Sequence, residues 1–245
     1  MFHAVEVAHF SFSKPDKEEN EDFVLLPTSD SQSNIVFAIA DGVGSLPGAS
    51  KASVCAINAV SSVLNDKDFS VELALDRAKR EVVNLASSDI RYSQAATTLT
   101  LIQVGSKEVI IGHVGDCRAY VRKSNRLVQL TVDHTRYQEL IDSGEHSARL
   151  LRKNKARLSS VITRALSKSF DMNIDLLILP IEDLVENDSI VISMMTDGAY
   201  DHWHKRARFS QSTMDSPSAF INSLRKRIKK APHDDFTCLN IRLER

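Results

Sequence analysis

The chain has 245 residues, of which 42% are hydrophobic and 26% are charged, and its formal net charge is −1 at pH 7. This composition is typical of a globular protein with a substantial core, and the near-zero charge gives no general reason to expect a nucleic-acid or membrane partner. No apolar run approaches the roughly 20 residues of a membrane span, and the odd number of widely spaced cysteines argues against disulfides, so we expect a cytoplasmic protein without a signal peptide.

Apolar and β-branched runs that are bounded by turn residues predict ten strands. Their approximate ranges are 3–12, 22–27, 34–40, 97–104, 107–115, 117–123, 127–132, 174–179, 189–196 and 236–243. The short spacing of the strands in the middle of the chain favours antiparallel hairpins, because parallel strands need long crossovers.

Helices are expected over 49–65 and 70–88, and Ser70 can act as the N-cap of the second. A later helix is marked more clearly, since Ser216 can cap it and Pro217 suits its first turn. Many antiparallel strands with helices in pairs indicate an α+β layered architecture.

Between about 135 and 170 the apolar pattern loosens, and we expect a short, flap-like helical insertion near the functional site. Its basic stretch over 149–157 is either an ordinary solvated helix face or a docking surface for an acidic or phosphorylated partner. No linker, repeat or low-complexity block divides the sequence, so we expect a single domain over 1–245.

Three apolar runs end on an aspartate beside a glycine, and these aspartates are Asp41, Asp116 and Asp197. A carboxylate placed where a buried strand leaves the core is held rigidly and still reaches solvent, as a metal ligand must. Each Asp-Gly pair can instead simply start a turn. Two further acidic groups, 20–22 and 233–235, border other apolar stretches, and the five clusters together indicate a site that gathers carboxylates.

Such a site needs a counter-charge. Two unit charges 4 Å apart repel by about 4 kcal/mol at an effective dielectric constant near 20, and each further pair adds to this. If the aspartates converge, a divalent cation must neutralise them, and oxygen ligands without a Cys/His set favour Mg²⁺ or Mn²⁺ over zinc.

Eight short motifs follow one another between residues 17 and 243. They are Asn20-Glu21-Asp22, Ala40-Asp41-Gly42-Val43-Gly44, Ala96-Thr97-Thr98-Leu99, His113-Val114-Gly115-Asp116-Cys117-Arg118-Ala119-Tyr120, Leu130-Thr131-Val132-Asp133-His134, Val161-Ile162-Thr163-Arg164-Ala165-Leu166, Thr196-Asp197-Gly198-Ala199-Tyr200-Asp201 and Asp234-Asp235-Phe236-Thr237. In this order they resemble the metal-dependent Ser/Thr protein phosphatases of the protein phosphatase 2C (PPM) family, in their compact bacterial form.

The resemblance implies a fold and a function. The fold is a β-sandwich of two antiparallel sheets flanked by pairs of antiparallel helices, in four αββα layers, with the metal site between the sheets. The function is hydrolysis of phosphoserine and phosphothreonine in proteins by a metal-bridging hydroxide, with two Mg²⁺ or Mn²⁺ ions and room for a third. The partners are then phosphorylated protein substrates, targets of a Ser/Thr kinase, and we expect a monomer.

The resemblance also assigns metal ligands residue by residue. Asp41 bridges two ions, and the carbonyl of Gly42 completes one coordination sphere. Asp197 and Asp234 hold one ion. Glu21 and Asp22 bind the ions directly or through waters.

Three other aspartates match further positions of the same pattern. Asp133 and Asp201 match positions that bind a third, weaker ion in bacterial relatives, although Asp133 alternatively only shapes the turn before His134. Asp116 matches a structural position, where it shapes a hairpin turn with Gly115.

Several positions depart from the family pattern, and two of them bear on substrate binding and on the acidic site. Where an arginine normally grips the substrate phosphate this chain has Lys17, which lacks the bidentate fork, so we expect weaker phosphate positioning. The usual aspartate–asparagine pair near the C-terminus is Asp234-Asp235. Lys17 leaves open an alternative function, that of a catalytically weak regulatory or phosphoprotein-binding protein, whereas the intact Asp41 and Asp197 favour an enzyme.

Other hydrolase chemistries fit less well. A cysteine-dependent phosphatase needs an arginine at a fixed spacing after its cysteine, and no cysteine of this chain has one there. His202 and His204 hint at zinc, but no further ligands follow at suitable spacing, so we interpret them as an exposed pair after a strand.

Overall fold

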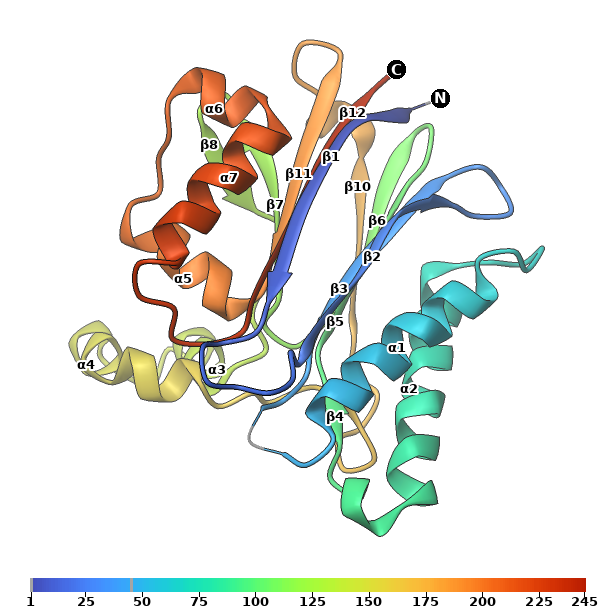
Figure 1. Ribbon diagram of the computed structural model, residues 1–245, viewed down its shortest axis with the longest axis vertical. Coiled ribbons are helices and arrows are strands. Elements are labelled where there is room, and N and C mark those ends of the chain that lie inside the picture. Colours follow the sequence, from blue (N-terminus) through green and yellow to red (C-terminus); the bar gives the residue numbers. More distant parts are fainter. Residues whose placement is uncertain (1, 45) are drawn as a thin grey trace.

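The structure is a computed structural model that describes residues 2–44 and 46–245 (Figure 1). Met1 and Ser45, which belong to the expected domain over 1–245, lie outside the described residues. The strands are β1 (His3–Phe12), β2 (Asp22–Ser29), β3 (Ile35–Asp41), β4 (Ala96–Thr97), β5 (Leu99–Val104), β6 (Glu108–Val114), β7 (Arg118–Lys123), β8 (Arg126–Gln129), β9 (Leu166–Ser167), β10 (Asp175–Pro180), β11 (Ser189–Met195) and β12 (Phe236–Glu244). The helices are α1 (Ala49–Val63), α2 (Val71–Ser88), α3 (Arg136–Asp142), α4 (Ala148–Ser159), α5 (Asp197–Lys205), α6 (Gln211–Asp215) and α7 (Pro217–Ile228), with 3₁₀ turns η1 (Ile90–Tyr92) and η2 (Ile181–Asp183).

Within the described residues, ten strands form two five-stranded sheets, and β4 pairs with β9 in a separate two-stranded sheet. The pairings in all three sheets are antiparallel. Sheet A has the order β1-β12-β11-β7-β8, and sheet B has the order β10-β6-β5-β3-β2. The expected hairpins form as β5–β6 and β7–β8, but they belong to different sheets. The chain therefore crosses from sheet B to sheet A between Val114 and Arg118.

The side chains of β3 explain the layering, because this strand is apolar on both faces. Val36 and Ala38 pack with residues of α1 and α2, whereas Phe37 and Ile39 pack between the sheets. Figure 1 shows α1 and α2 over the outer face of sheet B, with α5 and α7 over the outer face of sheet A. The expected α+β sandwich of two antiparallel sheets flanked by helix pairs is confirmed.

The helices that the sequence indicates are present and begin with their expected caps. The Ser70 hydroxyl accepts a hydrogen bond from the Leu73 amide at 3.1 Å, and the Ser216 hydroxyl accepts one from the Ala219 amide at 3.3 Å. The looser segment after β8 contains α3 and α4. In the described part of the chain, no helix is both long and apolar enough to cross a membrane.

Helix α5 is absent from the expected elements, because an Asp-Gly pair after a strand is typical of a turn. Its inner face buries Trp203 and also His202, whose Nε2 lies 3.1 Å from Nδ1 of His233. His204 is exposed. The expectation of an exposed histidine pair is therefore wrong for His202, because the helix turns this side chain inward.

Gly112 lies where α2 packs against sheet B, and a Cβ atom there would lie 2.3 Å from Leu75 Cδ1 and 2.6 Å from Val71 Cγ1. We expect Gly112→Ala to lower the free energy of unfolding by about 1–3 kcal/mol in urea denaturation, because the added methyl group overpacks this contact. The control is Gly105→Ala, whose Cβ would make only ordinary contacts at 3.4 Å. An equal loss in both variants would contradict the packing argument.

Candidate active site

Acidic side chains from five segments meet at one edge of the sandwich. The segments are the β1–β2 loop, the end of β3, the β6–β7 connection, the beginning of α5 and the loop before β12. They surround a cleft of about 640 Å³. Its acidic lining residues are Asp16, Glu21, Asp41, Asp116, Asp197, Asp234 and Asp235.

The structure brings together the side chains that the sequence assigns to the two main ions. Those that line the cleft are Glu21, Asp41, Gly42, Asp197 and Asp234. Asp22 lies opposite Asp41 in the β2–β3 register, and its Oδ2 accepts a 2.9 Å hydrogen bond from the hydroxyl of Thr196, which follows β11. This hydrogen bond joins sheet B to sheet A at the site.

The backbone around Asp41 is fixed by Thr97, at the end of β4, and by Thr98, which connects β4 to β5. The Asp41 amide donates to the Thr98 hydroxyl at 2.9 Å, and the Thr98 amide donates to the Asp41 carbonyl at 2.8 Å. The Thr97 hydroxyl donates to the same carbonyl at 2.9 Å. These bonds hold the end of β3 in one position, as a preorganised site requires.

The glycines beside Asp41 and Asp197 are needed for space. A Cβ atom at Gly42 would lie 2.4 Å from the Ala49 carbonyl oxygen, and one at Gly198 would lie 2.0 Å from the Asp235 carbonyl oxygen. Any larger residue must therefore push α1 or the start of β12 away from the cleft. These two Asp-Gly pairs mark close backbone contacts.

Burial and mutual repulsion raise the pKa values of the cleft carboxyls. The pKa of Asp22 rises to about 8, through burial and through the charges of Asp197 and Asp235. Burial and the neighbouring Asp234 raise the pKa of Asp197 to about 7. Burial and Asp22 also raise the pKa of Asp41 well above its usual range.

These donors fit a hard divalent cation. Oδ1 of Asp22 is buried and has no hydrogen-bond partner among the described residues, so one carboxylate oxygen is left for another ligand. In the described part of the chain, no three His, Cys, Asp or Glu side chains already converge as a metal cage. Mg²⁺ does not require one, because it keeps several waters and needs only one or two carboxylates.

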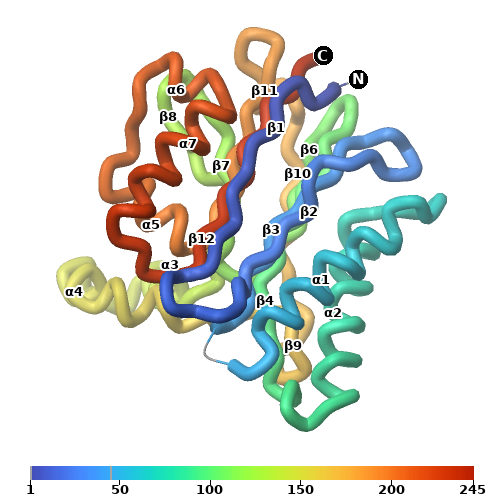
Figure 2. The backbone as a smooth tube through the Cα atoms, viewed as in Figure 1, coloured from blue at the N-terminus to red at the C-terminus, as the bar shows by residue number. Residues whose placement is uncertain are grey.

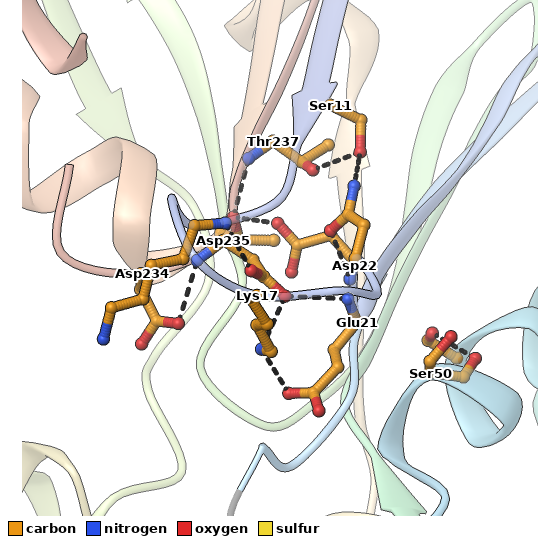
Figure 3. Close-up of polar contacts among 12 residues, drawn as sticks. Ser11, Lys17, Glu21, Asp22, Ser50, Asp234, Asp235 and Thr237 are labelled. Carbon is orange, nitrogen blue, oxygen red and sulfur yellow. Dashed lines mark hydrogen bonds and ion pairs between the residues drawn. The ribbon is translucent and has the colours of Figure 1, made fainter.

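Asp235, for which the sequence suggested no role, anchors the β1–β2 loop (Figure 3). It is 4% exposed, and its carboxylate accepts hydrogen bonds of 2.7 Å from the Lys14 amide, the Glu21 amide and the Lys17 ammonium group. One buried carboxylate thus fastens three points of the loop that precedes β2. The acidic pair before β12 was the available signal, but its loop partners are distant in sequence.

Lys17 lies in the cleft, where its ammonium group already forms ion pairs with two carboxylates. Its Nζ is 2.7 Å from Oε2 of Glu21 and 2.7 Å from Oδ2 of Asp235. Burial alone would lower the pKa of this ammonium group, but its bonds to Asp235 and Glu21 raise the pKa above its usual value. Lys17 is therefore a permanent cation inside an acidic cleft.

Asp116 belongs to the cleft, although the sequence suggested only a structural role. It lies in the β6–β7 connection after Gly115, whose φ of 105° suits a turn, so a turn-shaping position is compatible with its place. Its carboxyl also lines the cleft, and burial and Asp197 raise its pKa to about 8. The signal was present, because Asp116 ends an apolar run as Asp41 does.

Asp133 and Asp201, which the sequence assigns to a third ion, are outside the cleft lining of the described chain. Both carboxylate oxygens of Asp133 accept hydrogen bonds from the Arg118 guanidinium group, at 2.8 and 2.5 Å. That group stacks on Tyr200, 3.7 Å from the ring centroid. Asp201 is exposed on α5, one turn after Asp197.

Comparison with known proteins identifies the family. The family model described as "Protein phosphatase 2C" matches residues 15–232. The chain belongs to the protein phosphatase 2C family of Ser/Thr protein phosphatases. A serine/threonine phosphatase (stp) of Listeria welshimeri is 26% identical over 156 residues, which cover 60% of this chain and 61% of that protein. A protein of Mycoplasma genitalium is 24% identical over 247 residues, which cover 94% of this chain and 92% of that protein.

Solved structures of phosphatase 2C proteins share the fold. The serine/threonine phosphatase Stp1 of Staphylococcus aureus superposes with a TM-score of 0.78 at 19% identity, over 96% of this chain and 94% of that one. The catalytic domain of the phosphatase PstP, solved with two manganese ions, gives a TM-score of 0.76 at 18% identity over 100% of both chains. The family is metal-dependent.

The raised carboxyl pKa values predict how the stability of the metal-free protein depends on pH. The unfolded Asp22 carboxyl loses its proton near pH 3.8, whereas the folded one keeps it up to about pH 8. The contribution of this carboxyl to the free energy of unfolding is therefore fully present below pH 3.8 and is lost as the pH rises from there to about 8. Buried His113, whose pKa is lowered to about 4, has the opposite effect, but only below its ordinary pKa of 6.5. We expect the free energy of unfolding, measured with urea and a chelator, to fall between about pH 6.5 and pH 8.

Asp22→Asn should reduce the fall in the free energy of unfolding between about pH 6.5 and pH 8, because the variant has no proton to lose at that position. Asp68→Asn, an exposed change in the loop between α1 and α2, should leave it unaltered. If the metal-free wild type is equally stable or more stable at the higher pH, the raised carboxyl pKa values are wrong.

The Asp235 anchor should contribute measurably to stability. Asp235→Ala leaves the Lys14 and Glu21 amides without their acceptor and leaves the Lys17 ammonium group with Glu21 alone, so we expect a loss of about 3 kcal/mol in urea denaturation. Asp76→Ala removes the exposed ion pair with Arg80 and should cost no more than about 1 kcal/mol. Lys17→Met combined with Asp235→Ala should lose less than the sum of the single variants, and strict additivity would contradict the ion pair.

Proposed function

We propose that this chain hydrolyses phosphoserine and phosphothreonine in proteins, with Mg²⁺ or Mn²⁺ ions bound in the acidic cleft. The observation that carries the proposal is the gathering of buried and half-buried carboxylates next to both sheets in one cleft, in a chain of the protein phosphatase 2C family. These carboxylates repel one another, and a divalent cation removes that cost. A donor set made of oxygens alone favours Mg²⁺ or Mn²⁺ over zinc.

We assign the ligands of two ions to Asp41, the Gly42 carbonyl, Asp197 and Asp234, with Glu21 and Asp22 acting directly or through waters. When bound, two such ions lower the pKa of a water between them and neutralise charge on the phosphoryl oxygens. The PstP structure of the same fold holds two manganese ions, which supports this number. For a third ion, Asp116 is better supported than Asp133, because it lines the cleft while Asp133 is bonded to Arg118.

The chain's own groups prepare the site for this chemistry. Asp41 and Asp197 must be ionised to act as ligands, so cation binding releases protons that burial holds on these carboxyls. Lys17 is our candidate for orienting the substrate phosphate, as a point charge without the fork of an arginine. A phosphate that binds it must compete with Glu21 and Asp235.

The substrates are then proteins that a Ser/Thr kinase has phosphorylated. The Listeria relative is named as a serine/threonine phosphatase, which supports this substrate class. The two carboxylates on Lys17 are the one observation that favours the second candidate, a phosphoprotein-binding protein with little catalysis. Because Asp41, Asp197 and Asp234 line the cleft together with Glu21, we place the enzyme first.

The decisive experiment combines activity with metal binding. Mn²⁺ should raise the melting temperature of the wild type and support hydrolysis of p-nitrophenyl phosphate and of a phosphothreonine peptide. Asp41→Ala combined with Asp197→Ala should lower kcat at least about a hundredfold, because the ions then lose ligands that orient them. The same variant should no longer be stabilised by Mn²⁺.

The matched control is Asp66→Ala combined with Asp68→Ala, which removes two exposed carboxylates from the loop between α1 and α2. It should keep both the activity and the Mn²⁺-dependent rise in melting temperature. A wild type that Mn²⁺ stabilises but that hydrolyses no faster than the Asp41→Ala/Asp197→Ala variant would favour the binding protein. A wild type that shows neither effect would contradict both candidates.

A further inference from the structure

Helix α4 carries an uncompensated positive charge. Its twelve residues include five cationic side chains and no acidic one. They are Arg149, Arg152, Lys153, Lys155 and Arg157, and all five are exposed. The whole chain has a formal net charge of −1, so this helix concentrates charge that the rest of the molecule balances.

A comparison with α2 separates this helix from an ordinary solvated one. On α2, Arg77 pairs with Glu81 at 3.1 Å, and Arg80 pairs with Asp76 at 2.6 Å. These i,i+4 pairs neutralise the surface locally. In the described part of the chain, no ion pair joins the five cations of α4 to a carboxylate.

The end of α4 leads directly to the cleft. The helix ends at Ser159, and the residues that follow it, Ser160 and Ile162, line the cleft wall. Ser160 follows Arg157 by three positions in the chain, so their Cα atoms are at most about 11 Å apart. Figures 1 and 2 show α3 and α4 at the same end of the molecule as the β1–β2 loop. A peptide that leaves the cleft beside Ser160 reaches Arg157 within about three extended residues.

The two surfaces have opposite charge. The cleft is lined by carboxylates that repel acidic residues of a substrate, whereas the cations of α4 attract them. We propose that α4 is a docking surface for an acidic segment, rich in Asp and Glu, that flanks the phosphorylated residue of a protein substrate. This inference rests on the proposed phosphatase function. Complementary charge at the rim of a site sets substrate preference and the rate of encounter.

The test compares two phosphothreonine peptides that differ only in flanking residues, Asp and Glu in one and Asn and Gln in the other. At low salt, we expect the wild type to have a kcat/KM about tenfold higher for the acidic peptide, since several exposed charge pairs of modest strength contribute. Arg152→Gln, Lys153→Gln and Arg157→Gln together should abolish this preference by raising KM. Hydrolysis of the neutral peptide and of p-nitrophenyl phosphate should be unchanged, and salt should weaken the wild-type preference.

The matched control removes the same charge elsewhere. Lys107→Gln, Lys123→Gln and Arg126→Gln lie at the β5–β6 and β7–β8 turns, at the ends of β6 and β7 away from the cleft, and they should keep the preference. A wild type that hydrolyses both peptides equally, or an equal loss of preference in both triple variants, would overturn the docking surface.

The outcome separates docking from catalysis. If the wild type with Mn²⁺ hydrolyses no p-nitrophenyl phosphate, the proposed phosphatase function is wrong. Fluorescence anisotropy of the labelled acidic peptide then tests whether α4 binds acidic segments. Docking at α4 is supported if the α4 variant binds that peptide more weakly than the wild type while the control variant binds it as tightly as the wild type. Equal binding to the wild type and to both variants refutes it.

Discussion

The carboxyl groups of Asp22 and Asp116, which are buried, and of Asp41 and Asp197, which are half-buried, lie around one cleft. Each loses hydration there and is repelled by neighbouring carboxylates. Such an arrangement persists only if the backbone that carries it cannot move apart. Here the strand ends of both sheets supply that rigidity, through the β2–β3 register, the hydrogen bonds of Thr98 and the close backbone contacts at the two Asp-Gly pairs. The packing and hydrogen bonding of the sandwich therefore outweigh the repulsion and desolvation of the carboxylates at its edge.

The fold treats two groups of carboxylates differently. Asp235 and Asp133 each have an internal cation, Lys17 and Arg118 respectively, at hydrogen-bonding distance. The described structure gives Asp41 no such partner, and its pKa rises accordingly. This division gives Asp235 and Asp133 structural roles and, in the proposed function, leaves Asp41 and Asp197 to bind an external cation. Glu21 belongs to both groups, because it pairs with Lys17 and is also a proposed ligand. It also explains why a simple count of acidic residues does not identify the ligands.

Much of the fold could be predicted from the sequence, because its strands are marked by nearly continuous apolar runs such as β3. The cleft could be predicted in part, since Asp41 and Asp197 stand where such runs end. The role of Asp235 could not, because its partners Lys14, Lys17 and Glu21 are brought to it by the pairing of β1 with β12. Helix α5 could not be predicted for a related reason. Its Asp-Gly start is typical of a turn, and the packing of Trp203 on Phe220 of α7 is a tertiary contact that the local pattern does not indicate.

The crossing of the chain between the two sheets has a mechanical consequence. Asp22 and Asp41 belong to sheet B, whereas Asp197 and Asp234 adjoin β11 and β12 of sheet A. A cation held by both pairs would act as a reversible cross-link at one edge of the sandwich, next to the hydrogen bond from Thr196 to Asp22. Sliding of one sheet over the other would then require this cross-link to open, so the same ion would govern both the chemistry of the cleft and the shear stiffness of the whole β-sandwich.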